Sequence, residues 1–348
     1  MFQPNHILII KPSSLGDIVN GLPVLAALKR HWPDAGVDWV VKREWSELLT
    51  GHPMVGRVIF FPRTVAEGLA AWRQRRSHSY DMVIDLQGLL RSGLYAAMTG
   101  CRVRVGFCDG REGSSWFYTH RIKVAKNAVH AVDRCLDLVR QLGVTLGPPA
   151  QFPLPDGRAE QNWLEDLWRR YQILEKETVC VIHPAARWAT KRWPVSRFAQ
   201  LADELVARER FRVVIVGNTP PIGQFEEITH LMKHPAINLV GKTSLLQLAA
   251  LLRRSDLLVT NDSGPMHLAA AVGTPVVAIF GPTDPRRVGP YGTGHVVLRK
   301  DVDCSRCTRR ACVRDGACLK AIDVDEVHEA VRSEARSGMS PASARVFP

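Results

Sequence analysis

A short turn near the start of the chain carries a carboxylate that could act as a base. The turn, Lys11–Asp17, directly follows the apolar run Ile7–Ile10. Asp17 would stand at the beginning of a helix, where a carboxylate can take the proton of an attacking hydroxyl group. The plainer alternative is that Asp17 is a helix N-cap. The turn also contains small and polar residues that allow a tight bend and offer hydroxyl groups: Ser13, Ser14 and Gly16.

A second turn, Thr260–His267, follows the apolar run Leu257–Val259. Backbone N–H groups of a Ser-Gly turn at a helix start suit a diphosphate. The alternative is again a helix cap, with His267 as an ordinary surface residue. The turn Phe280–Pro285 ends the following strand at the same predicted sheet edge, which favours a ligand site. The candidate residues are Asp262, Ser263, Gly264, His267 and Thr283.

A third loop contributes positive charge. Lys191 and Arg192 follow the strand that ends at His183. A lysine in such a loop can neutralise a phosphate leaving group as a point charge. By itself, a Lys-Arg pair in a loop is weak evidence.

Apolar strand-like runs alternate with amphipathic helical stretches along the chain, which predicts βαβ units and parallel sheets, the α/β class. At 348 residues the chain exceeds the usual size of a single core. The segment Gly143–Gly157 is rich in Gly and Pro and is predicted to be a linker. We therefore predict one domain over residues 1–150, a second over 151–336 and a flexible tail over 337–348. Predicted strands include Ile7–Ile10, Val37–Val41, Met82–Asp85, Val179–His183 and Val276–Phe280, and predicted helices include Leu22–His31, Leu89–Thr99 and Val324–Arg332.

The chain is basic, with a formal net charge of +12. Residues 57–126 hold twelve Lys and Arg against five Asp and Glu. This excess favours an anionic partner, such as acidic lipid headgroups, a phosphorylated sugar or nucleic acid. Charge alone, however, leaves a merely solvated face of a basic protein as the stronger interpretation. No apolar run approaches the ~20 residues of a membrane span, and no secretory signal pattern is found at the start. A cytoplasmic location is therefore expected.

Four cysteines form a C-x2-C-x4-C-x5-C cluster: Cys304, Cys307, Cys312 and Cys318. Four thiolates at this spacing could hold a structural zinc or iron ion, although only the first pair has the tight knuckle spacing. Reduced free thiols are the equal alternative, and a disulfide is disfavoured in a reducing cytoplasm.

Three segments in this order resemble glycosyltransferase family 9, the ADP-heptose-dependent heptosyltransferases of lipopolysaccharide core assembly. They are SSLGD at Ser13–Asp17, KRWP at Lys191–Pro194, and NDSGPMHLAAAVGTPVVAIFGPTDP at Asn261–Pro285. The resemblance implies a GT-B fold of two Rossmann-like domains facing a cleft. It implies an inverting transfer without a catalytic metal, with Asp17 as the base and Lys191 on the donor phosphate. It also implies a diphosphate cradle of Asp262, Ser263, Gly264 and His267, and we add Ser13, Ser14, Gly16, Arg192 and Thr283 to the donor site.

The resemblance further implies ADP-L-glycero-D-manno-heptose as donor and a Kdo-containing lipid A core as acceptor, reached at the inner face of the inner membrane. A guanidinium pairs well with the carboxylate that each Kdo carries. We therefore predict an acceptor site in the first domain, made of Arg63, Arg111, His130 and Arg134. A solvated loop charge is the alternative for Arg111.

One departure from the family concerns the donor ribose. The family places a glutamate just after the strand Val213–Gly217, whereas this chain has Pro221 near that position, with Gln224 and Glu226 as shifted candidates. This keeps open a transferase that uses another nucleotide sugar, or another glycan or protein acceptor. A basic nucleic-acid-binding protein is the non-enzyme alternative, but the basic residues are spread over several elements and form no recognised binding motif.

Overall fold

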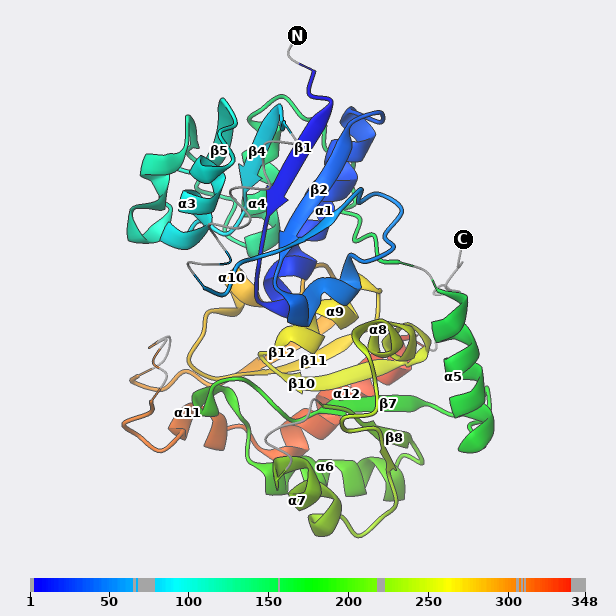
Figure 1. Cartoon of the computed structure of the whole chain (residues 1–348). Coiled ribbons are helices and arrows are strands. Elements are labelled where there is room, and N and C mark those ends of the chain that lie inside the picture. Colours follow the sequence, from blue (N-terminus) through cyan, green and yellow to red (C-terminus); the bar gives the residue numbers. More distant parts are fainter. Residues whose placement is uncertain are drawn as a thin grey trace. The chain divides into compact units, whose positions relative to one another are not determined.

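The computed structural model describes residues 3–64, 67, 79–155, 157–217, 223–304, 307, 309 and 311–338. The chain divides into two compact units, Met1–Asp156 and Gly157–Pro348, hereafter unit 1 and unit 2 (Figure 1). The division falls at the end of the Gly/Pro-rich segment that was expected to link two domains.

Unit 1 is built on a parallel sheet whose described strands have the order β3-β2-β1-β4-β5-β6. β1 lies in the middle, with Ile9 opposite Trp39 of β2 and Ile84 of β4. The strands are β1 His6–Ile10, β2 Gly36–Val41, β3 Val58–Phe60, β4 Met82–Asp85, β5 Val103–Phe107 and β6 His120–Ile122. The α-helices are α1 Leu15–His31, α3 Leu90–Met98 and α4 Ala131–Arg140, and the 3₁₀ helices are η1 Arg43–Leu48 and η3 Arg111–Phe117.

Unit 2 repeats this arrangement, with the order β12-β11-β10-β7-β8-β9 among the described strands. Val259 of β10 lies opposite Val277 of β11 and Ile182 of β7. The strands are β7 Val179–His183, β8 Arg212–Ile215, β9 Ile237–Asn238, β10 Leu257–Asn261, β11 Val276–Phe280 and β12 His295–Arg299. The helices are α5 Arg158–Arg170, η4 Ala189–Lys191, α6 Val195–Ala207, α7 Gly223–Leu231, α8 Leu245–Arg254, α9 Gly264–Ala271, α10 Pro285–Val288, α11 Ala317–Lys320 and α12 Val324–Gly338.

Both sheets therefore have a doubly wound strand order. The chain adds strands from the centre toward one edge, then returns to the centre and adds strands toward the other edge. The reversal lies between β1 and β4 in unit 1 and between β7 and β10 in unit 2. In open parallel sheets, ligands bind outside the carboxyl ends of the strands at this topological switch point. Each unit thus has one place where a ligand site is expected.

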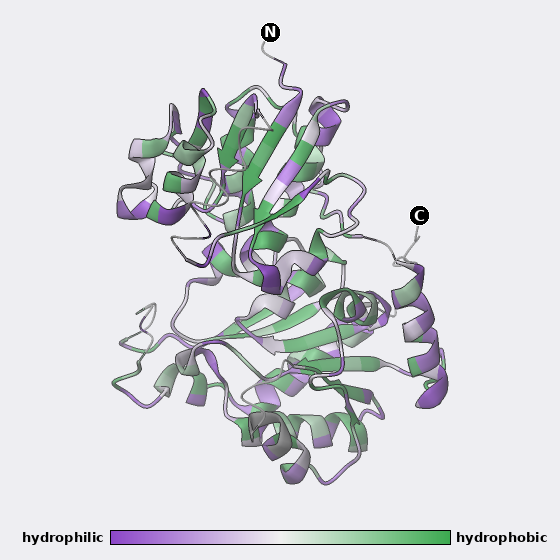
Figure 2. Ribbon diagram, viewed as in Figure 1, coloured by the Kyte–Doolittle hydropathy of each residue, from purple (hydrophilic) through white to green (hydrophobic). Residues whose placement is uncertain are grey.

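The central strands are mostly apolar, as the hydropathy colouring shows (Figure 2), and their polar residues stand at the carboxyl ends, such as Asn261 of β10 and His183 of β7. All five residues of β7, of β10 and of β11 are buried. Strands covered by helices on both faces need this continuous apolar pattern, unlike the alternating pattern of a half-exposed sheet. Among the described residues, no helix is long and apolar enough to cross a bilayer.

Several element boundaries differ from the sequence expectation. α1 begins at Leu15, which agrees with the helix start expected at Asp17 and precedes the predicted amphipathic stretch Leu22–His31, and it contains Pro23. α12 continues to Gly338, so the predicted tail begins inside a helix, and its residues 339–348 lie outside the described residues. The edge strands β6 and β12 and the helix α5 were not among the predicted elements.

Candidate active site

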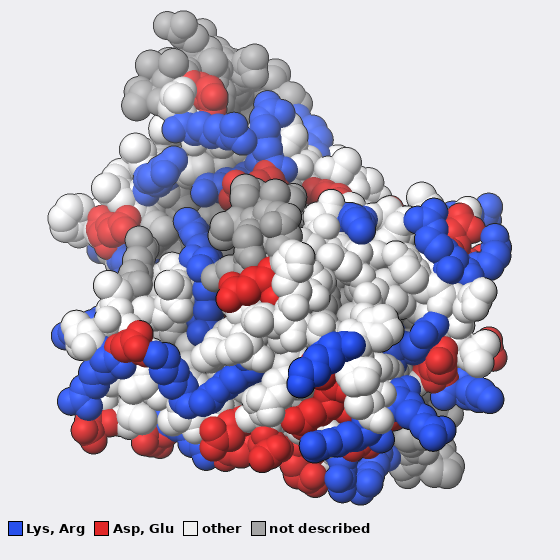
Figure 3. Space-filling view, turned by 90° about the horizontal axis from the view of Figure 1, so that it is seen from below, with Lys and Arg blue, Asp and Glu red and all other residues white. Residues whose placement is uncertain are grey.

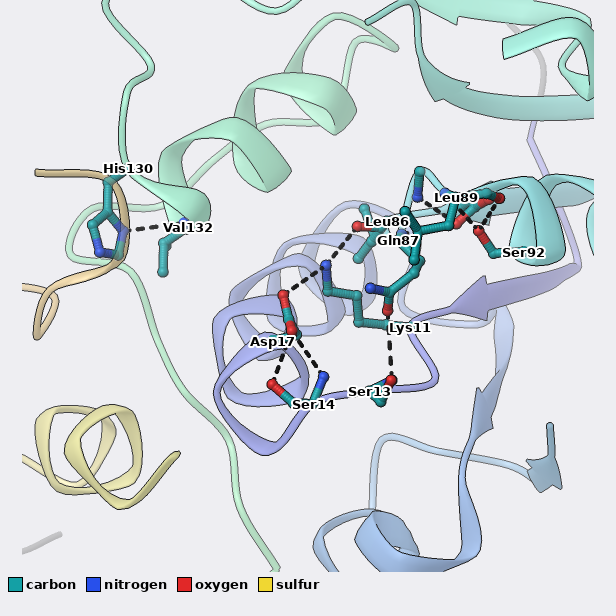
Figure 4. A network of polar contacts seen from close by, with 12 residues as sticks. Lys11, Ser13, Ser14, Asp17, Leu86, Gln87, Leu89, Ser92, His130 and Val132 are labelled. Atoms are coloured by element: carbon teal, nitrogen blue, oxygen red, sulfur yellow. Dashed lines mark hydrogen bonds and ion pairs between the residues drawn. The ribbon is translucent and has the colours of Figure 1, made fainter. Parts of the chain in front are cut away.

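At the switch point of unit 1, the start of α1 holds Asp17 between a lysine and a serine (Figure 4). Lys11 Nζ lies 3.5 Å from Asp17 Oδ1. Ser14 donates to Asp17 Oδ2 from its backbone N–H at 2.8 Å and from its hydroxyl at 3.0 Å. The Asp17 side chain is 42% exposed, whereas that of Lys11 is 8% exposed. One carboxylate thus faces solvent with a buried ammonium group beside it.

Asp17 also has a structural role. It is the third residue of α1 and forms a capping box with Ser14, which is the N-cap. The capping alternative considered from the sequence is therefore present, but it engages Oδ2 while Oδ1 faces Lys11. A cap and an exposed carboxylate are compatible in this geometry.

Lys11 was not among the predicted site residues. Its Nζ donates to Leu86 O at 2.7 Å, and Ser13 N donates to Gln87 Oε1 at 3.5 Å (Figure 4). Both contacts join the loop after β1 to the loop after β4. The available sequence signal was a lysine directly after an apolar strand. Lys is almost never buried without a partner, so a lysine at such a position is expected to have one.

The buried Asp85 fixes the loop after β4. Its Oδ1 accepts from the N–H of Gln87 at 2.8 Å and of Gly88 at 3.2 Å, and its Oδ2 accepts from the Tyr118 hydroxyl at 2.7 Å. Burial raises the pKa of Asp85 and that of Tyr118. The carboxyl group is fully sequestered, so its contacts organise the loop that carries Gln87 and do not face solvent.

The four predicted acceptor residues lie in different local settings. Arg134 donates twice to Asp109, at 2.9 and 2.7 Å, so its guanidinium is engaged within the unit. His130 is buried and caps α4 by accepting from Val132 N at 3.2 Å. Arg111 is exposed at the start of η3, and Arg63 is exposed after β3. Arg111 and Arg63 are the two that present side chains to solvent.

At the switch point of unit 2, the hydroxyl of Ser263 turns away from the helix it begins. Ser263 is the N-cap of α9 but makes no capping bond with its side chain. Its Oγ lies 3.2 Å from His183 Nδ1 and 3.1 Å from Thr260 Oγ1. The first turn of α9, which starts with Gly264 and Pro265 and includes His267, is thus not capped by its own serine.

His183 is neutral in this position. Burial lowers the pKa of His183 to about 4, because the charged imidazolium would lose its hydration. The sequence analysis used His183 only as the end of a strand. The neutral ring holds the Ser263 hydroxyl without adding charge beneath the helix start.

Lys191 and Asp262 form an ion pair of 2.5 Å, with side chains 17% and 6% exposed. Thr283 donates from Oγ1 to the same carboxylate oxygen at 2.5 Å. Three residues predicted from separate loops therefore meet in one cluster. Arg192, the neighbour of Lys191, donates from Nε to Ala186 O at 2.7 Å.

Asn261 is a third residue, after Lys11 and His183, that was not among the predicted site residues. It is fully buried; its Oδ1 accepts from Trp193 N at 2.9 Å and its Nδ2 donates to Pro184 O at 2.6 Å. One amide thus ties the end of β10 to both ends of the loop that carries Lys191. An amide side chain at the end of an apolar strand was the only sequence signal.

The cysteine cluster does not assemble as a metal site. Within the described part of the chain, no group of three or more His, Cys, Asp or Glu side chains is placed to hold a metal ion. Cys304, Cys307, Cys312 and Cys318 are free thiols. The described residues therefore give no support to the structural zinc or iron considered from their spacing.

The predicted ribose-binding segment falls largely outside the described residues. Pro221 is not described, and the side chains of Gln224 and Glu226 at the start of α7 are not described either.

Comparison of the chain with known proteins finds one family. Residues 69–317 match the model of glycosyltransferase family 9 (heptosyltransferase). The chain is 29% identical to lipopolysaccharide heptosyltransferase 1 of Pseudomonas aeruginosa, over 88% of this chain and 87% of that protein.

Two solved structures resemble the whole chain. One is E. coli ADP-heptose lps heptosyltransferase II, with a TM-score of 0.78, 25% identity and coverage of 95% of this chain and 99% of that one. The other is E. coli heptosyltransferase WaaC with ADP, with a TM-score of 0.72, 26% identity and coverage of 94% and 99%. The predicted α/β two-domain GT-B fold is confirmed by these neighbours and by the two doubly wound sheets. The family match spans more than two thirds of the sequence, so the chain belongs to glycosyltransferase family 9 and is a heptosyltransferase enzyme.

Proposed function

We propose that this enzyme transfers heptose from ADP-L-glycero-D-manno-heptose to the Kdo-containing lipid A core of lipopolysaccharide. The observation that carries the proposal is the pairing of an exposed carboxylate at one switch point with a buried cation and an open helix start at the other. Relatives named lipopolysaccharide heptosyltransferase 1, and neighbour structures with ADP and with ADP-2-deoxy-2-fluoro heptose, support it.

In this proposal, unit 1 serves the acceptor. Asp17 Oδ1 takes the proton from an acceptor hydroxyl, whose oxygen attacks the anomeric carbon of heptose. The second oxygen stays bonded to Ser14, which fixes the carboxylate as the proton arrives. Lys11 is a positioning residue, because it holds Asp17 and the loop after β4 together. Arg63 and Arg111 are exposed to pair with an acceptor carboxylate, while His130 and Arg134 support the same region of the unit.

Unit 2 serves the donor. As the glycosidic bond to ADP breaks, negative charge grows on the diphosphate. The N–H groups at the start of α9 and the ammonium of Lys191 are suited to bind that charge. Asp262 and Thr283 hold Lys191 in place, which assigns them an indirect part in donor binding. Ser263, Gly264, His267 and Arg192 complete the proposed donor side, and Ser13, Ser14 and Gly16 let the β1 turn approach the sugar.

The proposed acceptor also implies a location in the cell. A lipid-linked core is embedded in a bilayer, so we propose that the enzyme acts in the cytoplasm, in peripheral contact with the inner membrane. The basic excess of residues 57–126 supports this proposal through attraction to anionic headgroups.

A donor screen tests the proposal. Purified protein is incubated with Kdo-lipid A and a panel of nucleotide sugars, and released nucleotide is measured. Release of ADP only with ADP-heptose, together with an acceptor mass increased by one heptose, is the expected result. Turnover of a different nucleotide sugar would replace the donor, a case that the missing ribose glutamate near Pro221 keeps in view.

The nucleic-acid-binding alternative receives no support from the face of the molecule shown in Figure 3. On the face shown in Figure 3, Lys and Arg side chains are interspersed with Asp and Glu side chains. Mixed signs are typical of a solvated surface, whereas a nucleic-acid site usually gathers basic residues on one face. Duplex DNA binding with a steep salt dependence, and no sugar-nucleotide binding, would revive this alternative.

A further inference from the structure

Unit 1 exposes large apolar side chains on two adjacent elements. Trp116 of η3 is 78% exposed, and Leu94 and Leu90 of α3 are 46% and 42% exposed. Leu90 and Leu94 are four residues apart on a helix and therefore share one face. Keeping large apolar side chains in contact with water costs free energy, which a partner that covers them would recover.

The two elements form one rigid platform, which we define as α3 (Leu90–Met98) together with η3 (Arg111–Phe117). At Gly93 an added Cβ would meet Ser114 O at 2.9 Å, so the backbones are in direct contact there. Leu90 N donates to Glu112 Oε2 at 3.3 Å. The apolar side chains are thus presented from a fixed base.

Basic side chains accompany the apolar ones. Arg91 and Arg111 belong to the platform itself and are exposed, and Arg102, between α3 and β5, is exposed as well. The acid at Glu112 is engaged by Leu90 N, and Asp109, just before η3, is paired with Arg134. Tryptophan and leucine surrounded by arginine is the composition of segments that lie in the interface of an anionic bilayer.

The platform is connected to the loops around Asp17. α3 follows the loop of Gln87, which accepts from Ser13 N beside Asp17 (Figure 4). η3 follows the carboxyl end of β5 and is tied to the same loop through Arg111 N and Gly88 O at 2.9 Å. A surface that touches the platform is therefore close in structure to the proposed base.

We infer that the α3–η3 platform is the membrane-docking surface of this enzyme and that its partner is an anionic lipid bilayer. Trp116, Leu90 and Leu94 enter the headgroup region, and Arg102 contacts lipid phosphates, whereas Arg91 donates to Pro62 O at 3.4 Å. Three side chains cover far less than the roughly 800 Å² that each partner gives to a stable protein interface, whereas a peripheral membrane contact needs no such area. The inference rests on the proposed function, in which the acceptor is lipid-linked.

The test is flotation with vesicles of phosphatidylethanolamine and phosphatidylglycerol, with phosphatidylcholine vesicles for comparison. The intact wild-type protein should float with the anionic vesicles only, and less at 0.5 M salt, since screening weakens the arginine contribution. The double variant Trp116→Ser/Leu94→Gln should bind about 10-fold more weakly, because it loses the apolar part of the contact. Val313→Ser removes a 75% exposed apolar side chain in unit 2 and should bind as wild type.

A second measurement separates docking from the glycan site. With a water-soluble, deacylated acceptor, the double variant should turn over within 2-fold of wild type, and with acceptor embedded in vesicles it should be slower by about 10-fold. Three results would each overturn the inference. The double variant could float as well as the wild-type protein, the wild-type protein could fail to float with anionic vesicles, or the double variant could lose turnover on the soluble acceptor. Flotation as expected with a protein that transfers no heptose would overturn the proposed function and leave the docking surface standing. Melting curves of each variant check that it is folded.

Discussion

The two switch points use the same architecture in opposite ways. Both lie between the first and fourth strands of their unit, and both place a helix start after an apolar strand. In unit 1 the N-cap Ser14 bonds to Asp17 of its own helix, so the capping box closes the helix start and displays a carboxylate. In unit 2 the N-cap Ser263 bonds backward to His183 and Thr260, so its helix start is left uncapped by serine.

The two units also differ in which charged side chain of the ion pair is the more exposed. The anion of unit 1 is exposed and its cation is buried, since Asp17 is 42% and Lys11 8% exposed. In unit 2 the carboxylate of Asp262 is the more buried partner of Lys191. The comparison teaches that one fold can either display a carboxylate at a helix start or leave that start uncapped by its serine, according to the direction in which the serine bonds.

The largest effect is expected at the carboxylate of unit 1. Asp17→Asn keeps an oxygen for Ser14 but removes the base, so kcat should fall by ~10²–10⁴ while donor affinity changes little. Steady-state kinetics and calorimetric titration with ADP-heptose measure the two quantities. Turnover within a few-fold of wild type would reduce Asp17 to a helix cap.

The buried cation of unit 2 comes next. Lys191→Met removes a charge-assisted contact to the donor, and kcat/KM for ADP-heptose should fall by about 10- to 100-fold. The variant also leaves Asp262 buried without its cation, which should lower the melting temperature.

A matched variant separates these two consequences. Lys191→Met/Asp262→Asn should recover the melting temperature but not the donor kinetics. If it recovered both, Lys191 would be a structural residue only.

An arginine of unit 1 tests the division of labour between the units. Arg111→Ala should lower kcat/KM for the acceptor by ~10-fold, the scale of one lost charge-assisted hydrogen bond, and leave ADP-heptose affinity unchanged. Competition binding with each substrate provides the measurement. If the variant had wild-type acceptor kinetics, Arg111 would be a solvated charge. If it lost donor binding instead, the assignment of Arg111 to an acceptor site would be wrong.

A smaller effect is expected when the serine of unit 2 is released. His183→Leu lets the Ser263 hydroxyl turn to cap α9, so donor KM should rise by about 3- to 10-fold with kcat unchanged. The double variant His183→Leu/Ser263→Ala should equal Ser263→Ala alone, because the two residues act through one hydroxyl. Additive effects would contradict this account.

The same position gives a pH test. The folded pKa of His183, about 4, lies below its ordinary value of 6.5. Between these values the unfolded chain binds the extra proton, so wild-type stability falls as pH drops from about 6.5 to 4, and the contribution is fully present above 6.5. His183→Leu should lose this part of the acid sensitivity in urea-unfolding curves taken at several pH values.

The smallest expected effect is that of a chelator. Because the described residues of the cysteine cluster form no group that could hold a metal ion, we expect dialysis against EDTA to leave both turnover and melting temperature unchanged. About one zinc or iron per chain by elemental analysis, with a melting temperature that drops on chelation, would contradict this expectation.

The sequence predicted the buried part of the fold well. Met82–Asp85, Val179–His183 and Val276–Phe280 match the observed strands, because a strand covered on both faces is a continuous apolar run. The edge strands β6 and β12 carry exposed or half-exposed residues and lack that signal. The start of α1 was expected at the turn of Asp17, but the amphipathic pattern marked the helix only from Leu22, because its first turns contain Gly16 and Gly21, which are weak helix formers.

For the site, the sequence indicated which loops matter but not how their side chains pair. The motifs of Asp17, Lys191 and Asp262 were recognised from local spacing. His183 and Asn261 were missed because their partners Ser263 and Pro184 lie 80 and 77 residues away in the sequence. Only the strand order brings those residues together, and no local pattern encodes it.

Those long separations have a consequence for synthesis. Lys11 meets Leu86 across 75 residues, and Asn261 meets Pro184 across 77. On the ribosome, the loops after β1 and β7 emerge well before the strands that fix them, and each unit must wait for its fourth strand. The contact between Lys11 and Leu86 can therefore form early in synthesis, whereas the loop of Lys191 is not fixed until Asn261 has emerged. A nascent chain thus completes the loops around Asp17 first and the loop of Lys191 last.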